Sequence, residues 1–259
     1  MSTFLFDKII FGPVKSRRLG VSLGVNLMPT DSKVCSFDCI YCECGWNPKK
    51  QEQKAVLPSR DEVKQKMAEK LTEMVENKEL PDVITFAENG EPTLHPEFDG
   101  IIDDTIELRD KLAPKARIAV LSNSSMLFKD SVKRALLKVE DNILKLDSAF
   151  EETVKLIDCP VGRFNLNEVV ENLKSFNGKL IIQTLFVRGN HNDQRIDNAT
   201  ETEVSAWLKL IEEIKPLQVM IYTIDRDTPA AGLEKVNIEE LKQIASRVES
   251  LGIKVQVSG

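Results

Sequence analysis

The stretch CSFDCIYC, residues 35–42, holds three cysteines in a C-x3-C-x2-C spacing, with Tyr41 just before the last of them. Three close cysteines can ligate three irons of a [4Fe–4S] cluster, whereas ordinary electron-transfer clusters take four cysteine ligands. An open coordination position distinguishes a catalytic metal site from a closed structural one. The spacing of Cys35, Cys39 and Cys42 therefore predicts a cluster with one iron open to a further ligand.

A zinc site is the alternative for this loop. Cys44 follows Cys42 by two residues, so four thiolates lie within ten residues and can form a tetrahedral set. Structural zinc usually joins two separated cysteine pairs and closes the loop between them. Here all four cysteines crowd into one loop, and a single residue separates the last pair. This crowding favours the open cluster over the closed zinc site.

The cysteine spacing, with the aromatic residue before the third cysteine, resembles the radical S-adenosylmethionine (SAM) superfamily. The resemblance implies an enzyme in which the open iron binds the amino and carboxylate groups of SAM. It further implies that an electron cleaves SAM to a 5′-deoxyadenosyl radical, which abstracts hydrogen from a substrate in oxidoreductase-type chemistry. The expected electron donor is a reduced flavodoxin or ferredoxin.

Length and composition indicate one globular domain. The 259 residues and 29.2 kDa fit a single α/β barrel, since such barrels run to about 250 residues. We expect one domain over residues 1–259, with an N-terminal extension over residues 1–20 and a cluster loop over residues 30–46. The N-terminus lacks the pattern of a signal peptide, and no apolar run approaches the roughly 20 residues of a membrane span. Because the number of cysteines is odd and four of the five lie in one loop, they predict a metal site in a reducing cytoplasm and not a disulfide framework.

The charge balance is acidic, with 35 basic and 41 acidic residues and a net charge of −6. Nucleic-acid-binding domains commonly show a basic face. Two local basic clusters are candidates for such a face: Lys15, Arg17 and Arg18, and Lys49, Lys50 and Lys54. The lysines are typical of solvated surface. Arg17 and Arg18 lead into the first predicted strand, so we take them as possible substrate contacts.

Strand-like and helix-like segments alternate almost throughout, which is typical of βα units around a parallel sheet. The expected strands cover residues 21–26, 83–86, 118–121, 143–146, 180–187 and 218–224, with a short tail strand over 253–257. The first expected helix has an apolar stripe of Val63, Met67, Leu71 and Val75, and later helices cover 98–112, 129–138, 151–157, 166–175, 201–214 and 238–251. Six βα units predict an α/β fold: a partial (βα)6 TIM-like barrel, open along one side.

Polar residues follow the predicted strands, where the chemistry of βα barrels collects. Asn89-Gly90-Glu91-Pro92 resembles the superfamily's Gly-Gly-Glu-type motif, which lies along the methionine part of SAM and accepts from its ammonium. The resemblance implies cofactor-binding roles for a wider set: Tyr41, Asn89, Gly90, Glu91, Ser122, Asn123, Asp147, Ser148, Gln183 and Tyr222. A Gly-Pro turn, helix capping and buried hydrogen bonding are the alternative roles for members of this set.

The substrate is less clearly indicated than the cofactors. A resemblance to the wyosine-synthetase-like group of radical SAM proteins, related to tRNA 4-demethylwyosine synthase, rests on FGPVKSRRLGVSLGVN, CSFDCIYCECGWN, ENGEPTLHPEF and IYTIDRDTP. That group includes enzymes that build the tricyclic base of wyosine, which implies a tRNA base as substrate. Two features depart from the group: no cysteine precedes Cys35 for a second cluster, and Glu88 stands where small residues are common.

Other functions stay open from the sequence. A glycyl-radical-enzyme activase would act on a protein partner, and a zinc-binding or electron-transfer module would not be catalytic. Arg188 and His191 follow the fifth predicted strand and are possible substrate contacts. Cys159 is either a buried thiol or a hydrogen-atom donor, while His95 beside Pro96 is expected to be structural. The sequence assigns no residue as the catalytic group.

Overall fold

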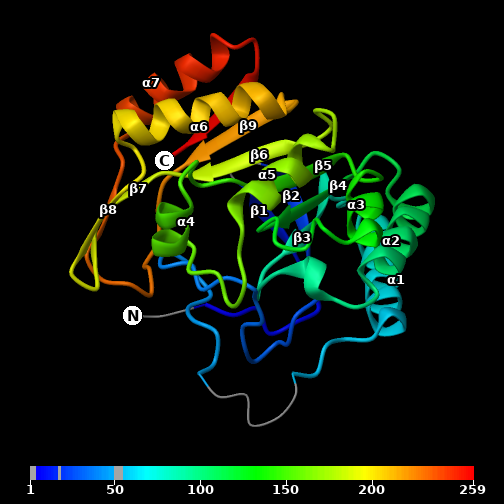
Figure 1. The fold of residues 1–259 in the computed structure, drawn as a ribbon. Helices are drawn as coiled ribbons and strands as arrows, with labels where there is room; N and C mark the ends of the chain where they lie inside the picture. The colour runs from blue at the N-terminus through cyan, green and yellow to red at the C-terminus, as the bar shows by residue number, and fades with distance from the viewer. Residues whose placement is uncertain (1–3, 17–18, 50–54) are drawn as a thin grey trace.

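The computed structural model describes residues 4–16, 19–49 and 55–259, which form a central eight-stranded sheet (Figure 1). The first pair of strands is antiparallel, and every later pair is parallel. In spatial order the strands are β1 (Ile10–Ser16), β2 (Gly20–Asn26), β3 (Val83–Ala87), β4 (Arg117–Ser122), β5 (Asp141–Lys145), β6 (Ile181–Leu185), β9 (Gln218–Tyr222) and β11 (Lys254–Ser258). This order confirms an α/β fold with an open, partial barrel.

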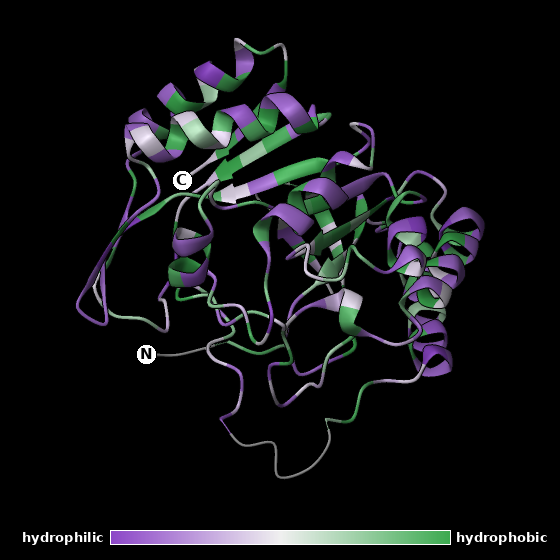
Figure 2. Cartoon of the chain, viewed as in Figure 1, coloured by the Kyte–Doolittle hydropathy of each residue, from purple (hydrophilic) through white to green (hydrophobic). Residues whose placement is uncertain are grey.

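Helices connect the parallel strands and cover the sheet. In Figure 1, α1 and α2 lie side by side at one end of the sheet, and α6 and α7 lie over β6 and β9 at the other. The helices are α1 (Arg60–Glu76), α2 (Phe98–Leu112), α3 (Asp130–Leu136), α4 (Glu151–Ile157), α5 (Leu166–Lys174), α6 (Glu201–Ile214) and α7 (Ile238–Glu249), with a 3-10 turn η1 (Pro92–Leu94). Figure 2 shows apolar residues along β6 and β9, while α6 and α7 carry both polar and apolar faces.

The inner face of the barrel is filled at the end where its strands begin. One buried residue each from β3, β4, β5, β6 and β9, with Leu19 just before β2, forms a small apolar cluster there: Leu19, Val83, Ala119, Ile143, Ile181 and Met220. Val83 and Ile181 are the first residues of β3 and β6, so this layer lies near the amino ends of the strands. Such side-chain layers make a barrel a packed core and not a pore. The polar candidate site residues lie at the opposite end of the barrel, where the strands end.

Helix α1 illustrates how sequence produces this packing. The Ser59 hydroxyl accepts from the Glu62 backbone N–H and so caps the first turn, as the sequence pattern predicts. Val63, Met67 and Leu71 are buried, but the predicted fourth member of the stripe is wrong. Val75 is 41% exposed, and Met74 takes its place in the core. With 3.6 residues per turn, the position three after Leu71 can face the sheet as readily as the position four after it.

The predicted fifth strand is two strands in the structure. It divides after Leu185, where β6 ends, and β7 (Val187–His191) leaves the barrel to pair with β8 (Gln194–Asp197) and β10 (Leu233–Lys235) in a separate antiparallel sheet. The N-terminal extension also contains β1, which was not expected as a strand. Its sequence includes Pro13, which a sheet tolerates at an edge, and β1 is the edge strand. Within the described ranges no helix has the length and apolarity to cross a membrane.

Candidate functional site

The loop that carries the cysteines packs against the end of β3. The Val34 N–H donates to the Asn89 carbonyl at 3.0 Å, and the Glu91 N–H donates to the Val34 carbonyl at 3.1 Å. Gly90 lies between these bonds with a φ of 146°, and a Cβ atom there would stand 1.9 Å from the Val34 carbonyl oxygen. Only glycine permits this approach. The glycine of the strand-end motif is therefore required for the cluster loop to dock.

The other side of the loop pairs with the segment that follows α4. Ser36 accepts from Val161, Asp38 donates to Cys159, and Ile40 donates to Ile157, all through backbone groups at 2.8 to 3.0 Å. Phe37 and Pro160 form the bridge between these two short stretches. Residues 34–40 are thus hydrogen-bonded on both sides, although they are not in a regular strand. This pairing gives the cysteine loop a defined position at the carboxyl edge of the sheet.

Two polar side chains hold the loop from inside. The ammonium of Lys33 is buried and donates to the Gly45 carbonyl at 2.8 Å. Asn47 accepts from the Cys35 N–H at 2.9 Å through its side-chain oxygen and donates to the Cys35 carbonyl at 3.0 Å. Its own N–H donates to Asp38 at 2.7 Å. Neither Lys33 nor Asn47 was identified from the sequence, because neither belongs to the cysteine pattern.

The three predicted ligand thiols lie close enough to influence one another. Burial raises the pKa of Cys35 to about 12 and raises that of Cys39, and the neighbouring thiols act in the same direction. The neighbouring Cys44, helped by Lys33, lowers the pKa of Cys42 below its ordinary value. Burial opposes the charge of Lys33, but Cys42, Cys35 and Cys39 raise its pKa. Across the described residues, no three His, Cys, Asp or Glu side chains meet as ligands of a single metal ion.

A buried network surrounds Tyr41 at the end of β5. The Tyr41 hydroxyl donates to Asp147, and to Asp158 at 3.0 Å. The Lys145 ammonium donates to Asp158 at 3.1 Å and to Asp147 at 3.2 Å, and it also contacts the Tyr41 hydroxyl and ring. The Cys39 thiol donates to Asp158 at 3.3 Å. Burial raises the pKa of Asp147 to about 7, although Lys145 opposes that rise.

The strand-end residues of β3 and β4 form a second network beside Cys35. The buried Glu91 carboxylate accepts from the Ser122 hydroxyl at 2.8 Å and from the Asn123 N–H at 2.6 Å. The Asn123 side chain donates to Ser36 at 2.9 Å and approaches the Cys35 sulfur at 3.5 Å. Burial raises the pKa of Glu91, and these hydrogen bonds oppose the rise. The structure thus brings Glu91, Ser122 and Asn123 together with the first cysteine.

Other predicted residues are engaged away from the thiols. Asn89 accepts from the Phe6 N–H and donates to the carbonyls of Phe6 and Pro29, each at 2.8 Å, so its side chain holds the N-terminal segment. The Ser148 hydroxyl donates to Glu203 on α6 at 2.6 Å. Gln183 is buried on β6. Tyr222, on the adjacent strand β9, interacts electrostatically with Tyr41 and Lys145.

Two of the four possible substrate contacts, Arg17 and Arg18, lie outside the described residues, as do Lys50 and Lys54 of the second basic cluster. Arg188 forms two hydrogen bonds to Glu240 on α7, at 3.0 and 3.1 Å. His191 stacks on Trp46 of the cysteine loop with ring centroids 6.1 Å apart.

The remaining cysteines donate to backbone carbonyls, and His95 is structural. Cys44 donates to Glu88 at 3.2 Å and Cys159 to Leu156 at 3.5 Å. His95 is buried, as expected, and its ring nitrogen is 2.9 Å from the Pro58 carbonyl oxygen.

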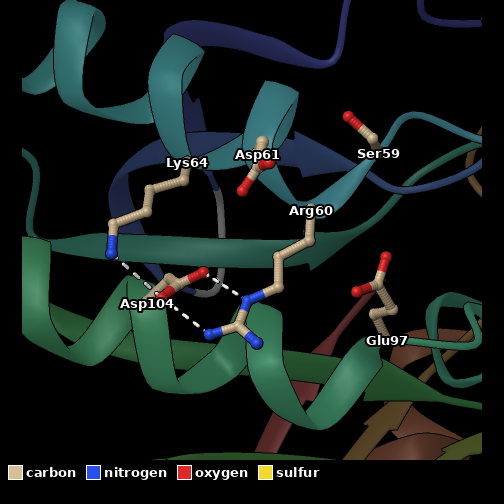
Figure 3. Close-up of a pocket in the computed structure, with 6 residues that line it drawn as sticks. All are labelled: Ser59, Arg60, Asp61, Lys64, Glu97 and Asp104. Carbon is tan, nitrogen blue, oxygen red and sulfur yellow. Dashed lines mark hydrogen bonds and ion pairs between the residues drawn. The ribbon is translucent and has the colours of Figure 1, made fainter.

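A cavity of about 320 Å³ lies elsewhere, between the first turns of α1 and α2 (Figure 3). Its lining is charged, and Asp104 already accepts from both Arg60 and Lys64 at 2.6 to 3.1 Å. None of the predicted site residues lines it. The cavity is an ion-paired surface hollow, separate from the cysteine loop.

Comparisons with known proteins add the family. No protein-family profile matches the chain. A UPF0026 protein of Methanocaldococcus jannaschii is 30% identical over 241 residues, which is 91% of this chain and 70% of that protein. The chain belongs to the UPF0026 family. A UPF0026 protein of Helicobacter pylori is 28% identical over 256 residues, covering 95% of this chain and 76% of the relative.

A third relative of the UPF0026 protein is much longer. It is named GTPase Obg, from Brachyspira hyodysenteriae, and is 31% identical over 250 residues. The match covers 95% of this chain but only 34% of that relative, so the chain spans about a third of its length.

Solved structures show the same fold. A radical SAM methyltransferase from Sphaerobacter thermophilus has a TM-score of 0.66 at 12% identity, covering 92% of this chain and 65% of that one. SuiB of Streptococcus suis bound to SAM gives 0.62 at 14% identity, over 88% of this chain and 49% of SuiB. Archaeal TYW1 has a TM-score of 0.55 at 14% identity, covering 88% of this chain and 71% of TYW1. The UPF0026 protein therefore has the fold of radical SAM enzymes.

Proposed function

We propose that this UPF0026 protein is a radical SAM enzyme in which Cys35, Cys39 and Cys42 hold a [4Fe–4S] cluster. The observation that carries the proposal is the placement of three mutually interacting thiols in one doubly paired loop at the carboxyl edge of the barrel. Catalytic residues collect at that edge in βα barrels. The fold shared with radical SAM enzymes supports the same assignment.

The residues present fit such a cluster. Cysteine thiolates are its usual ligands, and each one binds a different iron, so they stand farther apart than the ligands of a single ion. Cys44 donates to the Glu88 carbonyl, and its use as a fourth ligand would break that bond. Cys39 and Tyr41 are buried, which shields the inner part of the site from water, while Cys35 and Cys42 are partly exposed.

When bound, the cluster and SAM would supply reductive cleavage of SAM and hydrogen abstraction from a substrate. We propose that the Glu91, Ser122 and Asn123 network receives the methionine end of SAM, because it lies beside Cys35. Asp147 is the proposed partner of the ribose hydroxyls. Gln183 and Tyr222, from adjacent strands, are proposed to line the same space, and a flavodoxin or ferredoxin to supply the electron.

For the substrate we propose a tRNA base, on the resemblance of the chain to the wyosine-synthetase-like group. The stacked pair of Trp46 and His191 supports an aromatic substrate, since Trp46 belongs to the cysteine loop and His191 lies against it. A protein substrate, as for a glycyl-radical-enzyme activase, is the competing outcome. Incubation of the reduced enzyme with SAM and either deuterated tRNA or deuterated cell protein, followed by detection of label in 5′-deoxyadenosine, separates the two.

The test of the chemistry is anaerobic reconstitution with iron and sulfide, followed by reduction in the presence of SAM. We expect bound iron and sulfide, and release of 5′-deoxyadenosine and methionine. Cys42→Ala should lose all four signals, and Cys159→Ala is the matched control that keeps them. Protein that binds one zinc ion tightly, assembles no cluster and leaves SAM intact would instead be the zinc-binding module.

A further inference from the structure

Cys39 lies between an acidic and a basic side chain that are both far away in the sequence. Its sulfur is 3.3 Å from an Asp158 carboxylate oxygen and 3.6 Å from the Lys145 ammonium. Lys145 itself is 3.1 Å from that same oxygen. The side chain of Asp158 is 1% exposed and that of Lys145 is 16% exposed. These three groups therefore form one compact, water-poor triangle.

We infer that Lys145 is a positioning residue: the counter-ion that allows Cys39 to bind iron next to Asp158. The inference rests on the proposed function, because it concerns Cys39 as a ligand of the cluster. In this role Lys145 assists assembly of the cluster and makes no contact with the substrate.

The physical reason is a change in what Cys39 can offer. A free thiol donates a hydrogen bond, and in the structure it donates to Asp158. A cysteine that binds iron does so as a thiolate, and its proton is released. The thiolate then has nothing to donate, so two negative groups face each other at short range in a low dielectric. Lys145 contacts both and can donate to both.

The surrounding charges do not replace Lys145. Asp147 and Tyr41 also face the ammonium. Asp147 adds negative charge, and the neutral Tyr41 hydroxyl donates hydrogen bonds to the carboxylates. Lys33 acts on Cys39 only at longer range, and its ammonium donates to Gly45 and Asp38. Among the described residues, Lys145 is the one cation that donates a hydrogen bond to the Cys39 sulfur. Removing its charge should leave the thiolate facing an uncompensated carboxylate.

The experiment measures iron and sulfide per chain after anaerobic reconstitution, which needs no catalytic activity. Lys145→Met should retain less than about one iron per chain where the wild type holds about four, and Lys145→Arg should remain near four because it keeps the charge. The decisive variant is the double substitution Lys145→Met with Asp158→Asn. It should recover at least about half of the wild-type iron, since the repelling carboxylate is gone.

Lys145→Met with Asp147→Asn is the matched control. Asp147 also accepts from Lys145, but its other hydrogen bonds come from Tyr41 and Leu185 and not from Cys39, so this double variant should stay empty of iron. A purely structural role for Lys145 would make both double variants as poor as the single one, and that result overturns the inference. Normal iron content in Lys145→Met overturns it as well. A wild type that binds no cluster would instead refute the proposed function, so the two failures are distinguishable.

Discussion

At the scale of single residues, the cysteine loop contains thiols in contrasting environments. Cys39 is buried and donates to a carboxylate, while Cys42 lies near Cys44 and Lys33, which lower its pKa. Cys44 and Cys159 donate to backbone carbonyls. A thiol that serves the backbone is replaceable in a way that a metal ligand is not, because each ligand contributes one thiolate to one iron.

The first prediction follows from this contrast. Alanine at Cys35, Cys39 or Cys42 should abolish cluster assembly, measured as the visible absorption of the reconstituted protein. Alanine at Cys44 or Cys159 should leave that absorption intact. A Cys44 variant that loses the metal as completely as the Cys42 variant would show that the site is closed by four thiolates.

Glu88 provides a second residue-scale prediction. Burial, with the nearby charge of Glu43, raises the pKa of Glu88 to about 8. Between its ordinary pKa of about 4.5 and that value, the folded chain keeps a proton that the unfolded chain releases, so the free energy of unfolding falls as pH rises. Glu88→Gln should therefore be more stable than wild type by about 2–4 kcal/mol near pH 8, but nearly equal near pH 4.

Urea unfolding of both proteins across that range measures the effect. A stability difference that stays constant with pH would contradict the assignment. Glu88 also has a φ of 93°, a conformation that favours glycine. Glu88→Gly should consequently gain about a further 1 kcal/mol over Glu88→Gln at every pH.

At the scale of elements, the site depends on how an irregular loop is held against regular strands. The loop pairs with the end of β3 on one side and with residues 157–161 on the other. The docking at β3 changes the expectation for Gly90. If Gly90 served only to admit SAM, a side chain at this position would weaken SAM binding and leave the cluster intact. The contact with the Val34 carbonyl shows instead that Gly90→Val would displace the cluster loop itself.

We therefore expect Gly90→Ala and Gly90→Val to lose iron as well as SAM binding. Iron content and SAM titration on the same reconstituted samples check this. Gly162, where an added Cβ meets no neighbour, is the control position, although its φ of 89° makes alanine mildly strained there as well. Full iron in Gly90→Val would show that the loop does not need this approach.

Asn47 tests the inner support of the loop. Its side chain accepts from Cys35 and donates to the carbonyls of Cys35 and Phe37. Asn47→Ala leaves these groups without partners, at a cost of about 1–3 kcal/mol in the free energy of unfolding. Asn172→Ala, on the exposed face of α5, should change stability by less than about 0.5 kcal/mol. Equal effects in chemical denaturation would count against a special role for Asn47.

At the scale of the whole molecule, two bulk properties limit the function. The chain has five cysteines, and only Cys44 and Cys159 lie outside the predicted triplet. The net charge of −6 gives little general attraction for a polyanion. Both properties differ from what an enzyme with two clusters and a strongly basic tRNA-binding face would require.

We expect about four irons per reconstituted chain, the content of one [4Fe–4S] cluster. Free tRNA should bind weakly and with a shallow dependence on salt, because few phosphates are neutralised. Metal analysis and binding assays over a salt series measure both. About eight irons per chain, together with tight and steeply salt-dependent tRNA binding, would indicate a second cluster and a basic face that the charge balance hides.

Local pattern was sufficient for much of this molecule. The predicted helices over 98–112, 151–157 and 201–214 match α2, α4 and α6 at both ends, and the tail strand is β11. Hydrophobic periodicity is a pattern among residues close in the sequence, and it indicates which face of a helix or strand is buried. The division of the fifth strand escaped it, because the apolar residues Leu185, Phe186 and Val187 run across the break between the two sheets.

The sequence by itself determined the fold class and the cysteine triplet, since both are written in short-range spacing. Only the tertiary structure decided which charges surround the thiols. Asp158 reaches Cys39 across 119 positions and Lys145 across 106, and Asn89 uses its side chain on the N-terminal segment 83 positions away. Electrostatic and hydrogen-bond partners depend on distance in space. No local period in the sequence encodes that distance before the sheet brings its strand ends together.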